Sequence, residues 1–304
     1  MLSARDIKEV AHEVGFDLCG ITPAVALDSA RGRFEEWLAH ARNGSLDYLE
    51  RNVDKRFDAS LLVDGAESVV VCGVAYKNEF SDGYGDSATP RVASYALYED
   101  YHDTIRGMLR QMAQRLGLIE RGVMWRGFSD SAPVAEKTLA VRAGLGAIGR
   151  NSLLITPEYG SFIMLGELIF AEGVDEYDKP FEEDLCGECH LCVSHCPARA
   201  IIGGRAIDAS RCISRLTIEP IESQVRSDRL HGWVFGCDEC QSVCPYNKRV
   251  AVANDCVLMR VFSPTDYDAS RWRSMTAEEF KTTFGKTPLV RAGLERLKQN
   301  LPDE

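Results

Sequence analysis

Cysteines are the residues of this 304-residue chain whose type and spacing point most directly to chemistry. Eight of the eleven lie between Cys186 and Cys244. The first four form the run C-x2-C-x2-C-x3-C-P, which ends at Pro197 and is typical of bacterial [4Fe–4S] ferredoxins. Structural zinc sites also use C-x2-C pairs, but four cysteines within eleven residues, followed by proline, favour an iron–sulfur cluster.

A second run, C-x2-C-x3-C-P, begins at Cys237 and is one cysteine shorter than the first. Cys212 lies between the runs and can supply the missing thiolate, because two cubane clusters need eight. The pseudo-symmetric assignment gives one cluster to Cys186, Cys189, Cys192 and Cys244, and the other to Cys196, Cys212, Cys237 and Cys240. Such a module would pass electrons one at a time. Cys19, Cys72 and Cys256 fall outside the pattern and are interpreted as buried or spare thiols.

Composition limits the class of protein. Hydrophobic residues make up 45% and charged residues 27% of the chain, as in ordinary globular proteins. The sequence has no apolar run long enough for a transmembrane helix, and its polar N-terminus does not look like a signal peptide. We therefore expect a cytoplasmic protein without membrane contact, whose cysteines bind metal rather than form disulfides. The net charge of −11 works against nonspecific nucleic-acid binding, although local basic patches decide such contacts.

The elements that must position these cysteines follow from hydrophobic periodicity. We expect helices over 3–14, 30–41, 101–116 and 134–143, and strands over 16–21, 68–76 and 161–171. The apolar run 68–76 predicts a sheet that is covered on both faces. The predicted fold is an α/β (α+β) domain over 1–171, followed by an acidic, solvated linker over 172–184. A ferredoxin-like two-cluster module over 185–256 and a C-terminal helical tail over 257–304 complete it, with tail helices over 276–284 and 289–300.

A glycine-rich segment precedes the module. Residues 144–149 fit the bare pattern G-x-G-x-x-G, but a helix-like stretch comes before them, which argues against a dinucleotide site. The glycines either let the backbone approach a large ligand closely or form a tight turn without a ligand.

Four stretches make the chain resemble epoxyqueuosine reductases, the cobalamin-dependent iron–sulfur enzymes of tRNA queuosine synthesis. They are residues 100–102, 130–137, 143–151 and the cysteine module with 211–219 and 236–241. The resemblance is to the short form, without the C-terminal helical-repeat extension of longer members. The chain departs from the family at Ala147, where tryptophan is usual, at Arg150, where lysine is usual, and at Ser129, where valine is common.

The resemblance implies a two-electron deoxygenation of epoxyqueuosine to queuosine at the wobble position of tRNA, with cobalamin and two [4Fe–4S] clusters as cofactors. Asp130 matches the proposed general acid; its alternative is an N-cap for a helix that starts near Pro133. Asp100, Tyr101 and His102 match a motif near the substrate, or else merely begin a helix. Glu136 is as consistent with a first-turn helix charge as with function. The expected cofactor contacts are Gly144, Gly146, Gly149, Arg150 and Asn151.

The expected partners are tRNA carrying epoxyqueuosine and a reduced flavodoxin or ferredoxin, and the expected oligomeric state is a monomer. The candidates for the tRNA surface are basic residues of the module and the tail: Arg199, Arg205, Arg211, Arg215, Arg226, Arg229, Lys248, Arg249, Lys281, Lys286, Arg291, Arg296 and Lys298. Two alternatives remain open: a corrinoid reductive dehalogenase, and a noncatalytic electron carrier in which only the cysteine module acts.

Overall fold

The computed structural model describes residues 1–44, 46–85, 90–219, 226–253 and 255–302. Its centre is a four-stranded sheet with the order β1-β2-β7-β4. The strands are β1 (Leu18–Pro23), β2 (Ser68–Ala75), β7 (Ile163–Phe170) and β4 (Trp125–Phe128). All neighbouring strands are antiparallel, so the expected mixed fold is confirmed in its α+β form.

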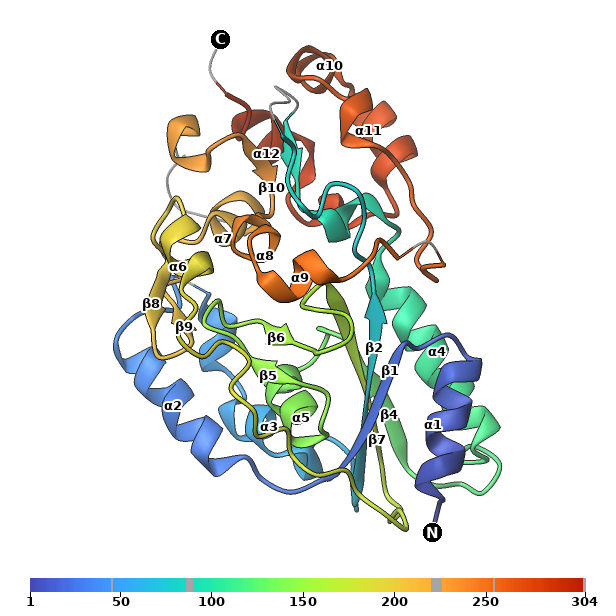
Figure 1. Ribbon diagram of the computed structural model, residues 1–304. Coiled ribbons are helices and arrows are strands. Elements are labelled where there is room, and N and C mark those ends of the chain that lie inside the picture. Colours follow the sequence, from blue (N-terminus) through green and yellow to red (C-terminus); the bar gives the residue numbers. More distant parts are fainter. Residues whose placement is uncertain (45, 86–89, 220–225, 254, 303–304) are drawn as a thin grey trace.

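Helices cover both faces of this sheet (Figure 1). The helices α1 (Ala4–Glu13) and α4 (Tyr101–Arg115) pack on one face, and α5 (Glu136–Arg142) packs on the other. The helices α2 (Asp28–Ala39) and α3 (Val53–Phe57) lie beside α5. Every residue of β2 is buried, which confirms the expectation of a doubly covered sheet. The sequence reading missed β4, because Trp125–Phe128 is short and contains an arginine and a glycine.

The cysteine module is built from short elements. They are α6 (Leu191–His195), β8 (Ile201–Gly203), β9 (Ala206–Ile207), α7 (Ile213–Ile218), β10 (Trp233–Phe235), α8 (Glu239–Ser242) and α9 (Pro245–Arg249). Strand β10 runs parallel to β3 (Arg91–Val92), so the module is joined to the first domain by backbone pairing. The hairpin β5 (Ala147–Ile148) and β6 (Leu154–Ile155) lies between the module and α5 (Figure 1). Six 3-10 turns complete the described elements: η1 (Asp47–Glu50), η2 (Ala59–Leu61), η3 (Ser94–Leu97), η4 (Ser227–Leu230), η5 (Pro264–Asp266) and η6 (Pro288–Arg291).

The expected C-terminal helical tail packs against the rest of the chain. It contains α10 (Ala269–Ser274), α11 (Ala277–Phe284) and α12 (Gly293–Gln299), and the helix expected over 289–300 is split into η6 and α12. Trp272 and Phe284 are almost fully buried in the same hydrophobic core as Ile7 and Leu109. The tail therefore belongs to the main core. No helix in the described part of the chain is long and apolar enough to cross a membrane.

The acidic stretch over 172–184, expected as a solvated linker, makes ion pairs with the first domain. Glu172 pairs with the N-terminal amine at 2.8 Å and with Arg121 at 2.7 Å. Asp178 accepts from the backbone N–H of Ile21 at 2.8 Å and pairs with Lys8 at 2.6 Å. These contacts of Glu172 and Asp178 hold part of the stretch against the first domain.

Candidate functional site

The four cysteines assigned to the second cluster line one cavity. It has a volume of about 380 Å³, and Cys196, Cys212, Cys237 and Cys240 all face it. Cys212 is the N-cap of α7, so this short helix places a sequence-isolated thiol beside the two ferredoxin runs. The structure thus brings together the four residues that spacing alone grouped.

The other four cysteines also gather. Burial raises the pKa of the Cys192 thiol, and the neighbouring thiols of Cys186, Cys244 and Cys189 raise it further. The pKa of Cys240 is raised well above its usual range, by burial first and in part by Cys192, so the two sets lie side by side. None of the eleven cysteines forms a disulfide. Within the described residues, no three histidine, cysteine or acidic side chains are positioned to hold a single metal ion.

Asp130 meets the start of α4 at the surface. It lies in the loop after β4 with a left-handed φ of 45°, and its side chain is 71% exposed. The Tyr101 hydroxyl donates to Asp130 Oδ2 at 3.1 Å, and His102 Nε2 lies 3.9 Å from the same oxygen. Asp100 caps α4 by accepting from the backbone N–H of His102, and its Oδ1 also lies 2.5 Å from His102 Nδ1. The structure therefore joins Asp100, Tyr101, His102 and Asp130 in one group, as the resemblance implies.

This group has marked electrostatic effects on its members. The hydrogen bond that the His102 ring donates to the Asp100 carboxylate raises the pKa of His102, which favours the charged imidazolium. The same contact lowers the pKa of Asp100. Burial raises the pKa of Tyr101, and the charge of Asp130 raises it further, so the phenol keeps its proton and can donate.

The N-cap alternative for Asp130 is wrong. Helix α5 begins at Glu136, and its N-cap is Ala135, which makes no side-chain capping bond. Asp130 lies several residues earlier, and its backbone N–H donates to Glu136 Oε1 at 2.6 Å. The carboxylate of Asp130 is therefore free of a helix-capping duty and faces outward.

Two glutamates lie behind Asp130. Burial raises the pKa of Glu136 to about 7, and the charge of Asp130 contributes. Glu167 is fully buried in β7, and burial followed by the charge of Glu136 raises its pKa well above the usual range. The sequence analysis missed Glu167, although a lone acid inside the apolar strand 163–170 is a signal that could have revealed it.

Further charged side chains around this site come from segments without any motif. Burial raises the pKa of Tyr48 in η1, and the charges of Glu219 and Asp130 raise it further. Arg291 in η6 binds Glu219 through two hydrogen bonds of 2.8 and 3.0 Å. Tyr48 and Glu219 were not predicted as part of the site, and Arg291 was predicted only for the tRNA surface, because only the folded chain brings η1, η6 and the end of α7 together.

The glycines of residues 144–149 are required by close packing. A Cβ on Gly146 would lie 2.2 Å from the carbonyl oxygen of Ile155, and one on Gly149 would lie 2.5 Å from the Ile155 side chain. Gly144 has a φ of 78°, and a Cβ there would lie 2.8 Å from the carbonyl oxygen of Lys179. The tight packing of the β5–β6 hairpin thus accounts for these glycines, and their contact with a cofactor stays a prediction.

The two polar residues of this segment point in different directions. Arg150 donates to the carbonyl of Gly187 at 2.5 Å and so holds the loop between two cysteines of the first set. Asn151 is buried and lines the cavity of the second set. Its Nδ2 has no hydrogen-bond partner among the described residues. Ser129 and Ala147, which depart from the family pattern, are both buried, and Ser129 donates to the carbonyl of Leu165 at 2.7 Å.

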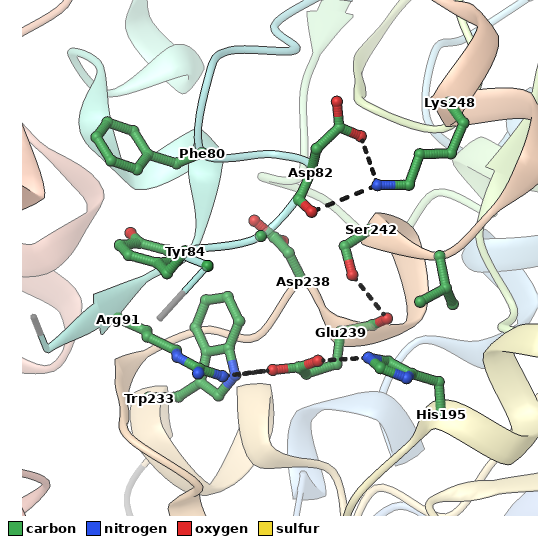
Figure 2. A pocket seen from close by; sticks show the side chains of 13 residues that line it. Phe80, Asp82, Tyr84, Arg91, His195, Trp233, Asp238, Glu239, Ser242 and Lys248 are labelled. Carbon is green, nitrogen blue, oxygen red and sulfur yellow. Dashed lines mark hydrogen bonds and ion pairs between the residues drawn. The ribbon is translucent and has the colours of Figure 1, made fainter. Parts of the chain in front are cut away.

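A second pocket of about 350 Å³ lies between the cysteine module and residues 80–85 and 91 of the first domain (Figure 2). Asp238 and Glu239 line both this pocket and the cavity of the second set, so they form the wall between them. Glu239 accepts from Arg91 at 2.9 Å and from Trp233 at 3.0 Å, and it pairs with His195 at 2.9 Å (Figure 2). These contacts fix the segment that carries Cys237 and Cys240.

Family profiles match two parts of the chain. A 4Fe-4S double cluster binding domain matches residues 185–247, and "Epoxyqueuosine reductase QueG, DUF1730" matches residues 56–131. The module therefore belongs to a class that holds two iron–sulfur clusters. Eight thiols in two groups, four of them around one cavity, fit that requirement.

Full-length comparisons agree. The epoxyqueuosine reductase of Cyclobacterium marinum is 38% identical over 299 residues, which is 97% of this chain and 94% of the relative. An epoxyqueuosine reductase from Bacillus subtilis, solved with its catalytic aspartate loop swung out of the active site, is 28% identical with a TM-score of 0.83. Another, solved with a tRNA-Tyr epoxyqueuosine-modified stem loop, is 26% identical with a TM-score of 0.82. Each alignment with these structures covers 97% of this chain and 79% of the other.

A reductive dehalogenase structure is more distant. It is 16% identical with a TM-score of 0.51, and the match covers 96% of this chain and 36% of the other, so it shows a shared fold alone. The epoxyqueuosine reductase of Cyclobacterium marinum, in contrast, shares 38% identity with this chain over almost the whole length, and the epoxyqueuosine reductase profile also matches. This chain belongs to the epoxyqueuosine reductase family.

Proposed function

We propose that this chain reduces epoxyqueuosine in tRNA to queuosine by a two-electron deoxygenation. The observation that carries the proposal is the short connection between the second cysteine set and Asp130. Tyr95 lines the cavity of that set and packs edge-on against Tyr101, with ring centroids 6.2 Å apart. The Tyr101 hydroxyl in turn donates to Asp130. Electrons and a proton can therefore reach one substrate from neighbouring side chains.

The cysteines would hold two [4Fe–4S] clusters, with the first on Cys186, Cys189, Cys192 and Cys244. The second would lie on Cys196, Cys212, Cys237 and Cys240, around the cavity that opens toward Tyr95. Bound there, the clusters would supply single electrons in sequence. A reduced flavodoxin or ferredoxin remains the expected donor, and a monomer the expected state.

We expect cobalamin to bind beside the second set. Leu46, Leu153 and Ile218 give the cavity an apolar wall, as a corrin ring requires, and the Asn151 amide nitrogen supplies an unsatisfied buried donor. Asn151, and backbone near Gly146 and Gly149, would hold the cofactor. When bound, it would supply a strongly reducing metal centre that acts on the epoxide.

Asp130 would give the proton that the departing oxygen needs. An alkoxide is a poor leaving group, so a positioned acid lowers the barrier. Corrin and tRNA together would cover the exposed carboxyl group, and burial favours its protonated form. Tyr101 would orient Asp130 through its hydroxyl, and His102, held by Asp100, would supply positive charge near the substrate.

Turnover of a defined RNA tests this function. The purified chain, reconstituted anaerobically with iron, sulfide and cobalamin, is reduced and mixed with an epoxyqueuosine-modified tRNA stem loop. We expect queuosine in the digested RNA, and no queuosine when cobalamin is left out. Dehalogenation of a bromophenol with no reaction on the RNA would instead support a dehalogenase, and no reaction of either kind with eight irons bound would support an electron carrier.

A further inference from the structure

Two cysteines outside the cluster sets face each other in the central sheet. Cys19 of β1 and Cys72 of β2 are direct partners in the antiparallel register. Both side chains lie on the face of the sheet that α1 and α4 cover, because Cys72 belongs to that core and Cys19 packs against it. Spacing in the sequence gave no reason to pair them, since they belong to neither ferredoxin run.

The backbone hydrogen bonds show which kind of pair they form. In an antiparallel ladder, pairs that exchange hydrogen bonds alternate with pairs that do not. Immediately after β1, the N–H of Ala24 donates to the carbonyl of Glu67 at 2.9 Å, in continuation of the register of the two strands. Counting back in steps of two leaves Cys19 at a position that is not hydrogen-bonded to β2, like Pro23, which has no N–H to donate. Cys19 and Cys72 therefore form a non-hydrogen-bonded pair, in which side chains approach most closely.

The other neighbour of β2 leads to the same result. Just beyond β2, the N–H of Tyr76 donates to the carbonyl of Phe162 at 2.9 Å. Alternation from that bond gives Cys72 a hydrogen-bonded partner in Gly166 of β7. The backbone N–H and carbonyl of Cys72 thus point toward β7, as they must if its pairing with β1 is the non-hydrogen-bonded kind.

This arrangement matches the geometry of a disulfide. The Cα atoms of non-hydrogen-bonded partners lie about 4.5 Å apart, and disulfides join Cα atoms about 4.4–6.8 Å apart. Because the strands are already paired, the bond requires rotation of two side chains and no movement of a strand. The hydrogen bond that the Cys72 thiol donates is a weak one, to the Met112 sulfur at 3.8 Å, and it competes little with a bond to Cys19.

We propose that Cys19 and Cys72 form a redox site, at which hydrogen peroxide converts the two thiols into a disulfide. Cys19 is partly exposed and Cys72 is fully buried, so the peroxide reaches Cys19 first. The Cys19 sulfur takes one oxygen atom as a sulfenic acid, and the rest of the peroxide leaves as water. The Cys72 thiol then attacks that sulfur, and the hydroxyl group leaves as a second water. Two thiols thus lose two electrons, and one peroxide accepts them.

The two thiols suit different steps of this reaction. Burial raises the pKa of the Cys72 thiol well above its usual range, which fits the second, resolving position better than the first. Intracellular disulfides are mostly transient, so we expect thiol reductants to reverse this one. The bond forms whether or not the chain acts on tRNA, and its test needs no turnover.

Peptide mapping of the reconstituted holoenzyme tests the proposal. The protein is treated anaerobically with increasing hydrogen peroxide, unfolded in N-ethylmaleimide and digested with trypsin, which releases Cys19 in residues 9–31 and Cys72 in residues 57–77. We expect these two peptides to be joined, two hydrogen atoms lighter than their sum, and to separate in dithiothreitol. Cys19→Ser should remove the joined species. Cys256→Ser is the control and should keep it, because Cys256 lies in no strand and has no cross-strand partner in the described part of the chain.

Thermal unfolding gives a second readout. A bond between β1 and β2 restricts the unfolded chain, so the peroxide-treated wild type should melt about 5 °C higher before dithiothreitol is added than after it. The melting temperature of Cys19→Ser should not respond to dithiothreitol. The inference is overturned if both wild-type peptides stay separate at every peroxide concentration, if either cysteine joins a different one, or if Cys19→Ser responds to dithiothreitol as the wild type does.

Discussion

At the scale of single residues, two side chains hold the loop of Asp130 in place. Its loop holds a left-handed φ of 45°, which costs a non-glycine residue free energy, and the Glu136 and Tyr101 hydrogen bonds offset that cost. The resemblance gave Asp130, Tyr101 and His102 because they stand in recognisable motifs. Glu167, Tyr48 and Arg291 stand in none, so only the folded structure shows that they belong to the site.

Asp100 offers a test of the charge on His102. We expect Asp100→Asn to lower the pKa of His102, because asparagine still caps α4 but no longer carries charge. The raised pKa stabilises the fold below the unfolded-state pKa of about 6.5, and this contribution is lost as the pH rises through the folded-state value. The variant should therefore melt at a lower temperature than wild type at about pH 5 but not at about pH 9.

The control for this experiment is Asp268→Asn. Asp268 caps α10 by accepting from the backbone N–H of Arg271 at 2.7 Å, and no histidine bond accompanies it among the described contacts. A melting difference that does not change with pH in Asp100→Asn, or an NMR titration of His102 that matches wild type, would show that the carboxylate does not set the histidine charge.

At the scale of elements, short helices and strands bring residues that are distant in sequence close together. Periodicity predicted α1, α4 and the strands β2 and β7, because each of them buries apolar residues. It could not predict β3 or β10, because strands of two or three residues carry no period. The two sets of cysteines could be predicted from sequence, because ligation of a [4Fe–4S] cluster requires a characteristic spacing of cysteines.

Cys212 is the residue at the start of α7 on which the second cluster depends. We expect Cys212→Ser to lower the iron content from about eight to about four per chain, because one cubane loses a thiolate ligand. Cys256→Ser, outside both sets, should keep about eight. Iron and sulfide analysis after anaerobic reconstitution measures this; full iron content in Cys212→Ser would remove Cys212 from the ligand set.

The β5–β6 hairpin is tested by a single methyl group. Gly146→Ala would push a Cβ to within 2.2 Å of the Ile155 carbonyl oxygen, and we expect it to destabilise the fold by about 1–3 kcal/mol. Gly32→Ala is the matched control, because a Cβ there meets nothing within 4 Å and α2 should gain about 0.5–1 kcal/mol. Thermal unfolding of both variants measures the difference, and equal melting temperatures would show that the hairpin relaxes freely.

At the scale of the whole molecule, the structure revises the picture of separate parts. The acidic stretch and the tail both pack on the first domain, because their charges and aromatic rings find partners there that composition does not reveal. Several basic residues suggested for tRNA are also engaged: Arg205 pairs with Asp184, Arg226 with Asp228, Lys248 with Asp82 and Arg291 with Glu219. These ion pairs mean that the number of basic residues overstates the free positive surface.

The central claim is that electrons from the cysteine module and a proton from Asp130 act on the same epoxide. The most direct test is one turnover of the reduced, cobalamin-loaded enzyme on an epoxyqueuosine-modified tRNA stem loop, with queuosine quantified by nucleoside mass spectrometry. We expect Asp130→Asn to form queuosine at least about 100-fold more slowly than wild type, with unchanged iron content and RNA affinity. Asp103→Asn, an exposed aspartate on α4, should match wild type. Queuosine formation by Asp130→Asn at the wild-type rate would contradict the claim.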